Sequence, residues 1–160
     1  MPIHLAKASY PLPVSRRLLW MRYGVAAFFV IITLAQLFAF EKFGTTINEL
    51  VPSFSMRGSE IVAAIIVVLE VAALPSLLIV ALSPLARALS RLAGPLVLIA
   101  WYVLVYCGIL TARMPNSGLL GSDIHLPASF WVLLVVMIAF VATVATQYFD
   151  MRAQHHLHRK

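Results

Sequence analysis

The stretch that decides the fold is residues 59–83, which read SEIVAAIIVVLEVAALPSLLIVALS. It is apolar almost throughout, and a helix of this length crosses a bilayer at about 1.5 Å per residue. Near its middle lies one carboxyl group, Glu70. A carboxyl group at that depth is costly, so it needs a partner, a proton or a water-filled neighbourhood. The stretch therefore predicts a membrane helix with one polar side chain that requires an explanation.

The composition of the whole chain points to lipid as its solvent. Of its 160 residues, 62% are hydrophobic and 11% are charged. A soluble domain of this size could not bury so much apolar surface. The formal net charge of +6 raises nucleic acid as a partner. The basic residues lie at the ends of apolar segments, however, where they act as topology signals, so we expect a lipid bilayer and no nucleic acid.

Four apolar segments are separated by links that contain proline, glycine or charged residues. They predict an all-α fold, an integral membrane four-helix antiparallel bundle with up-down-up-down topology, because short links favour antiparallel neighbours. The transmembrane domain is expected to cover residues 16–148, between an N-terminal tail (1–15) and a basic C-terminal tail (149–160). The expected spans are about 18–40, 59–83, 95–112 and 127–148.

Two links carry local signals. In the first, Thr46 and Glu49 have the spacing of a capping box and an apolar set follows, so we expect a short interfacial helix that ends before Pro52. The second, residues 85–94, reads LARALSRLAG and is interpreted as a basic link. Pro95 suits the first turn of a helix, so the third span is expected to open there.

The basic residues orient the predicted bundle. They concentrate in the N-terminal flank, the second link and the C-terminal tail. The first and third links hold only Lys42, Arg57 and Arg113. By the positive-inside rule, both termini are expected to be cytoplasmic, in a bacterial cytoplasmic (inner) membrane with the first and third links in the periplasm.

Glu70 has two interpretations at this point. It is either a proton-carrying or ligand-binding carboxyl group, or a buried carboxyl group that fixes helix packing through a polar neighbour. Gln36 shares a helical face with Thr33 and Phe40, and that face is expected to point into the bundle, since lipid would leave the amide unsatisfied. The candidate partners of Glu70 are Gln36, Lys42, Tyr102 and Tyr106.

Aromatic residues of the third span form the second candidate feature. Trp101, Tyr102 and Tyr106 either line a flat quinone-like ligand or pack against other helices. The candidate ligand-binding set is therefore Glu70, Gln36, Lys42, Trp101, Tyr102 and Tyr106, with a quinone as the cofactor to consider.

No catalytic residue and no metal site is expected. The sequence contains no P-loop, dinucleotide fingerprint, HExxH motif or nucleophile elbow. Cys107 is the single cysteine, which excludes an internal disulfide, and it reads as a small buried apolar residue. The tail histidines are interpreted as contacts to anionic headgroups rather than metal ligands. They are His155, His156 and His158.

Three short motifs resemble the DoxX/MauE-like superfamily of four-helix membrane proteins. The first span ends in FEKFG (40–44), similar to the lysine-bearing end of that group, and the second contains LEVAALPSLL (69–78). The third link, PNSGLLGSDIHLP (115–127), resembles the Asn-Cys-Gly-Cys-Phe-Gly loop of the family. Asn116, Gly118 and Gly121 match that loop, whereas Ser117 and Leu119 replace its cysteines and Leu120 its aromatic residue.

The resemblance implies a four-helix membrane fold, an interest in Glu70 and Lys42, and a tendency to work beside another membrane protein. Members of the family are associated with membrane redox systems, with disulfide-dependent maturation of periplasmic enzymes and with chaperoning of membrane proteins. A thiol relay needs an accessible thiolate. With the loop cysteines replaced and Cys107 expected inside a helix, we do not transfer the disulfide chemistry.

The expected function is that of a non-catalytic accessory subunit, or an assembly or maturation factor, of a larger membrane complex of redox or respiratory type. The alternative is a quinone- or small-molecule-binding subunit of a membrane oxidoreductase, with Glu70 as proton acceptor and the third-span aromatic residues lining the site. A small transporter ranks third, because the chain has no internal repeat and one deep acid.

Overall fold

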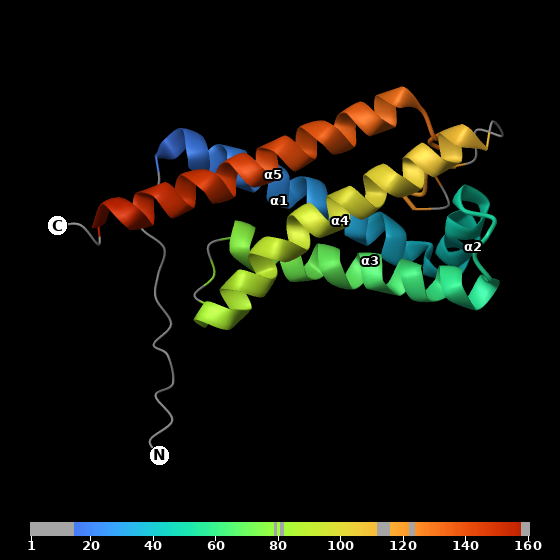
Figure 1. The fold of residues 1–160 in the computed structure, drawn as a ribbon, viewed down its shortest axis with the longest axis horizontal. Helices are drawn as coiled ribbons and strands as arrows, with labels where there is room; N and C mark the ends of the chain where they lie inside the picture. The colour runs from blue at the N-terminus through green and yellow to red at the C-terminus, as the bar shows by residue number, and fades with distance from the viewer. Residues whose placement is uncertain (1–14, 79, 81, 112–115, 122–123, 158–160) are drawn as a thin grey trace, which may run out of the picture.

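The computed structural model describes residues 15–78, 80, 82–111, 116–121 and 124–157. Over this part the regular secondary structure is entirely helical, without strands, and Figure 1 shows the helices lying side by side. Four of them are long and apolar enough to cross a membrane, counting residues Phe130–Phe149 of the last. The all-α prediction is therefore confirmed. The helices are α1 Arg16–Phe38, α2 Phe40–Leu50, α3 Met56–Leu77, α4 Pro84–Leu110 and α5 Phe130–Leu157.

The predicted N-terminal tail lies almost entirely outside the described part, whereas the backbone of the C-terminal tail is described to Leu157. Of the N-terminal tail, only Ser15 is described. The backbone of α5 continues to Leu157, well past the predicted span end at residue 148. The side chains of the tail histidines lie outside the described residues.

Serine side chains set the start of three helices. The hydroxyl oxygens of Ser15, Ser55 and Ser83 accept hydrogen bonds from backbone N–H groups three residues later, at 3.4, 3.2 and 3.3 Å. Such caps satisfy donors that have no partner within the helix. At Ser83 the cap is followed directly by Pro84 in the first turn, and this combination starts α4 eleven residues before the predicted position at Pro95.

The second and third spans therefore differ from the prediction. The segment 85–94 is not a link but the first turns of α4, so Arg87 and Arg91 lie on a helix. Pro95 lies inside that helix and cannot donate to the carbonyl oxygen of Arg91. The side-chain nitrogen of Gln147, on α5, donates to that oxygen at 2.7 Å. A neighbouring helix thus repairs the bond that proline removes.

Pro75 lies inside α3, and a related set of contacts surrounds it. The Ser90 hydroxyl of α4 accepts from the backbone N–H of Ser76 at 3.0 Å and donates to the carbonyl of Ala72 at 2.6 Å. It therefore bridges the backbone pair one residue beyond the bond to Val71 that Pro75 cannot make. The guanidinium of Arg22, on α1, donates to the carbonyl of Ser76 at 2.6 Å. α3 ends at Leu77, two residues after Pro75 and short of the predicted residue 83.

The repair at Pro95 makes a testable prediction. Gln147→Leu is expected to lower the free energy of unfolding by about 1 kcal/mol, because it removes the hydrogen bond that the Gln147 side chain donates to the Arg91 carbonyl. In a Pro95→Ala background the loss should shrink toward zero, since the backbone N–H of the introduced alanine can donate to the same carbonyl. Denaturation of the four variants in detergent measures the coupling; equal losses in both backgrounds would contradict it.

A break at Ala39 separates α1 from α2. Its backbone, with φ −113° and ψ 27°, ends α1 and lets the chain turn. The short helix predicted before Pro52 is present, but it begins at Phe40 and not at Thr46. The prediction that Phe40 continues the inward face of Thr33 is therefore wrong. Phe40 lies on α2 and is 41% exposed. The buried residues of α2 are Phe43, Gly44, Thr46, Ile47 and Leu50.

α3 is the central element of the bundle. It packs against α1, α2 and α4, whereas α5 contacts α4 and, over a smaller area, α1. Close approach is possible where residues are small. A Cβ atom on Gly44 would lie 3.0 Å from the Glu60 side chain, and one on Gly94 would lie 3.1 Å from Thr143. The arrangement places the middle of α3, and with it Glu70, inside the bundle.

Candidate functional site

Glu70 lies on the buried face of α3. That face repeats every three or four residues, as a helix packed on one side requires. Its members are Ser59, Ala63, Ile66, Val67, Glu70, Ala73 and Leu77. The Glu70 side chain is fully buried, with an exposed fraction of 0%. Its carboxyl group must therefore find its hydrogen-bond partners within the protein.

Three side chains from two other helices donate to the Glu70 carboxyl group. Trp101 of α4 donates through Nε1 to Oε1 at 2.9 Å, and Gln36 of α1 donates through Nε2 to the same oxygen at 3.1 Å. Thr33, one turn before Gln36, donates its hydroxyl to Oε2 at 2.9 Å. Both carboxyl oxygens are engaged by uncharged donors, so the group ties α1, α3 and α4 together at one point.

The donors are themselves enclosed. Trp101 and Gln36 have exposed fractions of 0% and Thr33 of 4%. The ring of Phe43, from α2, lies 6.0 Å from that of Trp101 between centroids. The amide oxygen of Gln36 has no hydrogen-bond partner among the described residues. The centre is thus a buried polar cluster with the Phe43 ring on one side.

The described part of the third link covers this cluster from the α2 end. Gly118 faces the Phe43 ring and Thr46 of α2, since a Cβ there would lie 3.3 and 3.0 Å from them. Gly121 lies directly on the backbone of α1, where a Cβ would come within 2.4 Å of the Ala35 carbonyl oxygen. Both glycines have positive φ angles, 71° and 74°. The segment reaches the end of the cluster only because these positions lack side chains.

Asn116 holds the segment in this shape. Its side-chain oxygen accepts from the backbone N–H groups of Gly118 and Leu126, both at 3.2 Å. Its side-chain nitrogen donates to the Gly121 carbonyl at 3.4 Å. The backbone N–H of Ser117 donates to the Leu126 carbonyl at 2.7 Å. The three loop residues that carry the family resemblance are therefore the residues that shape this turn.

The predicted ligand-binding residues separate into two groups. Glu70, Gln36 and Trp101 come together at the centre. Tyr102 and Tyr106 lie on the outer face of α4, 39% and 46% exposed, and their rings stack with centroids 6.4 Å apart. Tyr102 lines a hollow of about 130 Å³ between α4 and α5.

Lys42 also lies away from the centre. It is exposed on α2, beside a hollow of about 370 Å³ at the α1–α2 junction. Cys107 is half-buried within α4 with a free thiol, inside a helix as predicted. Among the described residues, no three His, Cys, Asp or Glu side chains gather as metal ligands would.

Thr33 is a member of the cluster that was not a candidate ligand residue. Its spacing of three residues from Gln36 places both on one face of α1, and Thr33 could have been predicted from that spacing.

Comparison with protein families, with curated proteins and with solved structures finds no match. The DoxX/MauE-like resemblance therefore stays a prediction, and function is inferred from the geometry of the site.

Proposed function

We propose that the chain is a non-catalytic accessory subunit, or an assembly or maturation factor, of a larger membrane complex of redox or respiratory type. The observation that carries the proposal is the enclosure of Glu70. Its two carboxyl oxygens accept hydrogen bonds from Thr33, Gln36 and Trp101, all on the same chain. Glu70 lines none of the hollows at the α1–α5, α4–α5 and α1–α2 junctions. An acid used in this way holds helices together.

The proposal includes insertion in a bilayer as an antiparallel up-down-up-down bundle. Exposed aromatic residues near both ends of the outer helices support it. On α1 they are Trp20 and Phe38, and on α5 they are Trp131 and Tyr148. At the helical rise each pair is about 26 Å apart, close to the thickness of a hydrocarbon core. Aromatic belts lie at this depth in membrane proteins.

We further propose a bacterial cytoplasmic membrane, with both ends of the described chain on the cytoplasmic side. The colour gradient in Figure 1 supports this orientation, since it reverses direction from α1 to α3, from α3 to α4 and from α4 to α5. The starts of α1 and α4 therefore lie at the same end, and this brings Arg16, Arg17, Arg87 and Arg91 to one side of the bundle. A basic end is retained in the cytoplasm.

The quinone-binding alternative has less support from the geometry. It requires an acid and aromatic side chains around one ligand. Tyr102 and Tyr106 point outward, whereas Trp101 donates to Glu70 and is fully buried. An oxidoreductase subunit of that kind would have to bring the ligand to Glu70 through a closed core.

Purification from membranes in a mild detergent tests the accessory role. The tagged chain is expected to recover one other membrane protein in a near-stoichiometric amount, and deletion of the chain should lower the abundance of that protein. Glu70→Gln, assayed below its melting temperature, should restore that abundance and leave the bound quinone content unchanged. Recovery of the chain alone in several mild detergents would contradict the proposal. A change in quinone content with Glu70→Gln would favour the alternative.

A further inference from the structure

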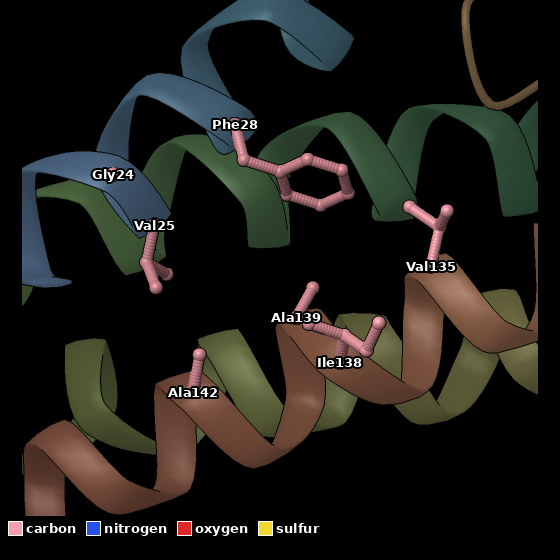
Figure 2. A pocket seen from close by; sticks show the side chains of 7 residues that line it. All are labelled: Gly24, Val25, Phe28, Val135, Ile138, Ala139 and Ala142. Atoms are coloured by element: carbon pink, nitrogen blue, oxygen red, sulfur yellow. The ribbon is translucent and has the colours of Figure 1, made fainter.

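A groove of about 260 Å³ lies between α1 and α5. Figure 2 shows Val25 of α1 pointing toward α5, and Ala139 and Ala142 of α5 pointing toward α1, with open space between them. Every residue that lines the groove is apolar or glycine. Its volume is many times the roughly 30 Å³ that a water molecule occupies in the liquid, but it offers water no hydrogen-bond partner. Its chemistry therefore suits hydrocarbon.

Gly24 keeps the α1 wall of the groove open. A Cβ atom at this position would meet nothing within 4 Å. The opposite wall carries the short side chains of Ala139 and Ala142. Phe28 and Val135 close one end of the groove in Figure 2. The space is bounded by two helices and lined by apolar side chains, as a site for a hydrocarbon chain requires.

Arg17 lies on the same face of α1 as Gly24, nearer to the basic end of the bundle. It precedes Gly24 by seven residues, which on a helix is about two turns and about 10 Å along the same face. Its side chain is exposed. Phe28 lies about 16 Å beyond Arg17, close to the roughly 15 Å depth of one leaflet's hydrocarbon. A phosphate held at Arg17 would thus let an acyl chain reach the far end of the groove.

We propose that this groove binds one acyl chain of an anionic phospholipid whose phosphate is held by Arg17. The proposal rests on the bilayer insertion in the proposed function but not on any protein partner. A guanidinium suits a phosphate because its donors form a planar fork.

Native mass spectrometry of the delipidated protein tests the proposal, with phosphatidylglycerol and phosphatidylethanolamine of matched acyl chains as probes. The wild type is expected to bind one phosphatidylglycerol about fivefold more tightly than phosphatidylethanolamine, as one arginine near an anionic headgroup provides. Gly24→Leu should weaken binding of both lipids by about tenfold, which corresponds to losing burial of only two methylene groups. Arg17→Gln should remove the preference and keep the binding.

Matched controls separate these effects from general damage. Ala27→Leu introduces the same side chain on an exposed face of α1, adding three carbon atoms where Gly24→Leu adds four. Arg16→Gln removes a charge about a quarter turn away from the face of Arg17 and Gly24. Both controls should bind lipid as the wild type does. Ala142→Leu fills the groove from the opposite wall, should Gly24→Leu fail to fold. Unchanged lipid binding in the folded groove variants, or a wild-type dimer that Gly24→Leu converts to monomer, would overturn the proposal. Because the purified chain is used alone, the result is independent of whether a partner protein exists.

Discussion

Replacing Glu70 with alanine is expected to lower the free energy of unfolding by about 3 kcal/mol or more. The substitution removes the acceptor for three buried donors, those of Thr33, Gln36 and Trp101. A buried donor left without its acceptor costs about 1–3 kcal/mol, and the space left by the side chain adds a further loss. Reversible denaturation in detergent measures the change.

Two further variants define what the carboxyl group contributes. Glu70→Gln keeps one acceptor oxygen but turns an N–H₂ group toward other donors, so it should lose less stability than Glu70→Ala. Glu60→Ala removes an exposed carboxyl group from the same helix and should change stability by less than about 0.5 kcal/mol. Equal stability of Glu70→Ala and the wild type would show that the cluster does not hold the helices together.

Gly121→Ala is the second substitution with a large expected effect, a loss of about 3 kcal/mol. The new methyl group would lie 2.4 Å from the Ala35 carbonyl oxygen, and backbone atoms on α1 cannot move aside as a flexible side chain can. The φ angle of 74° adds about 1–2 kcal/mol for a residue with a Cβ. Overpacking of this kind contributes about 1–3 kcal/mol.

Gly24→Ala is the matched control for this prediction. It adds the same methyl group at a helical glycine where nothing lies within 4 Å. Alanine is the better helix former, so stability should be unchanged or should rise by up to about 1 kcal/mol. Thermal melts of both variants in one detergent give the comparison. A Gly121→Ala protein as stable as Gly24→Ala would mean that the loop does not lie on α1 as described.

Part of the central cluster could be predicted from the sequence. An amide at Gln36 within an apolar helix has to face the interior, and Glu70 is the deepest acid in the chain, so their pairing follows from the cost of leaving either in lipid. The choice of Trp101 over Tyr102 or Tyr106 could not be predicted. Most of α4 is apolar on every side, and its rotation about its axis is set by packing rather than by hydrophobic pattern.

The helix ends could be predicted less well, because both internal prolines act through distant partners. Proline usually marks a boundary, and on that basis Pro95 was expected to start a span. It lies within α4 because Gln147, 56 residues away along the chain from Arg91, supplies the missing donor. At Pro75 the distant partner is Ser90, which bonds the Ser76 N–H group and the Ala72 carbonyl on either side of the proline. No local pattern contains these long-range contacts.

The side-chain contacts beside Pro75 and Pro95 also impose an order on assembly. The backbone of α3 beside Pro75 is bonded by Ser90, which belongs to the next helix in the chain, and the carbonyl that Pro95 frees in α4 is bonded by Gln147, which belongs to the helix after that. In the proposed bilayer, each of these helices would therefore be inserted with unpaired backbone groups that are bonded only when the next helix is in place. The helices of this chain would therefore pack in their order along the sequence, and α5 would pack last.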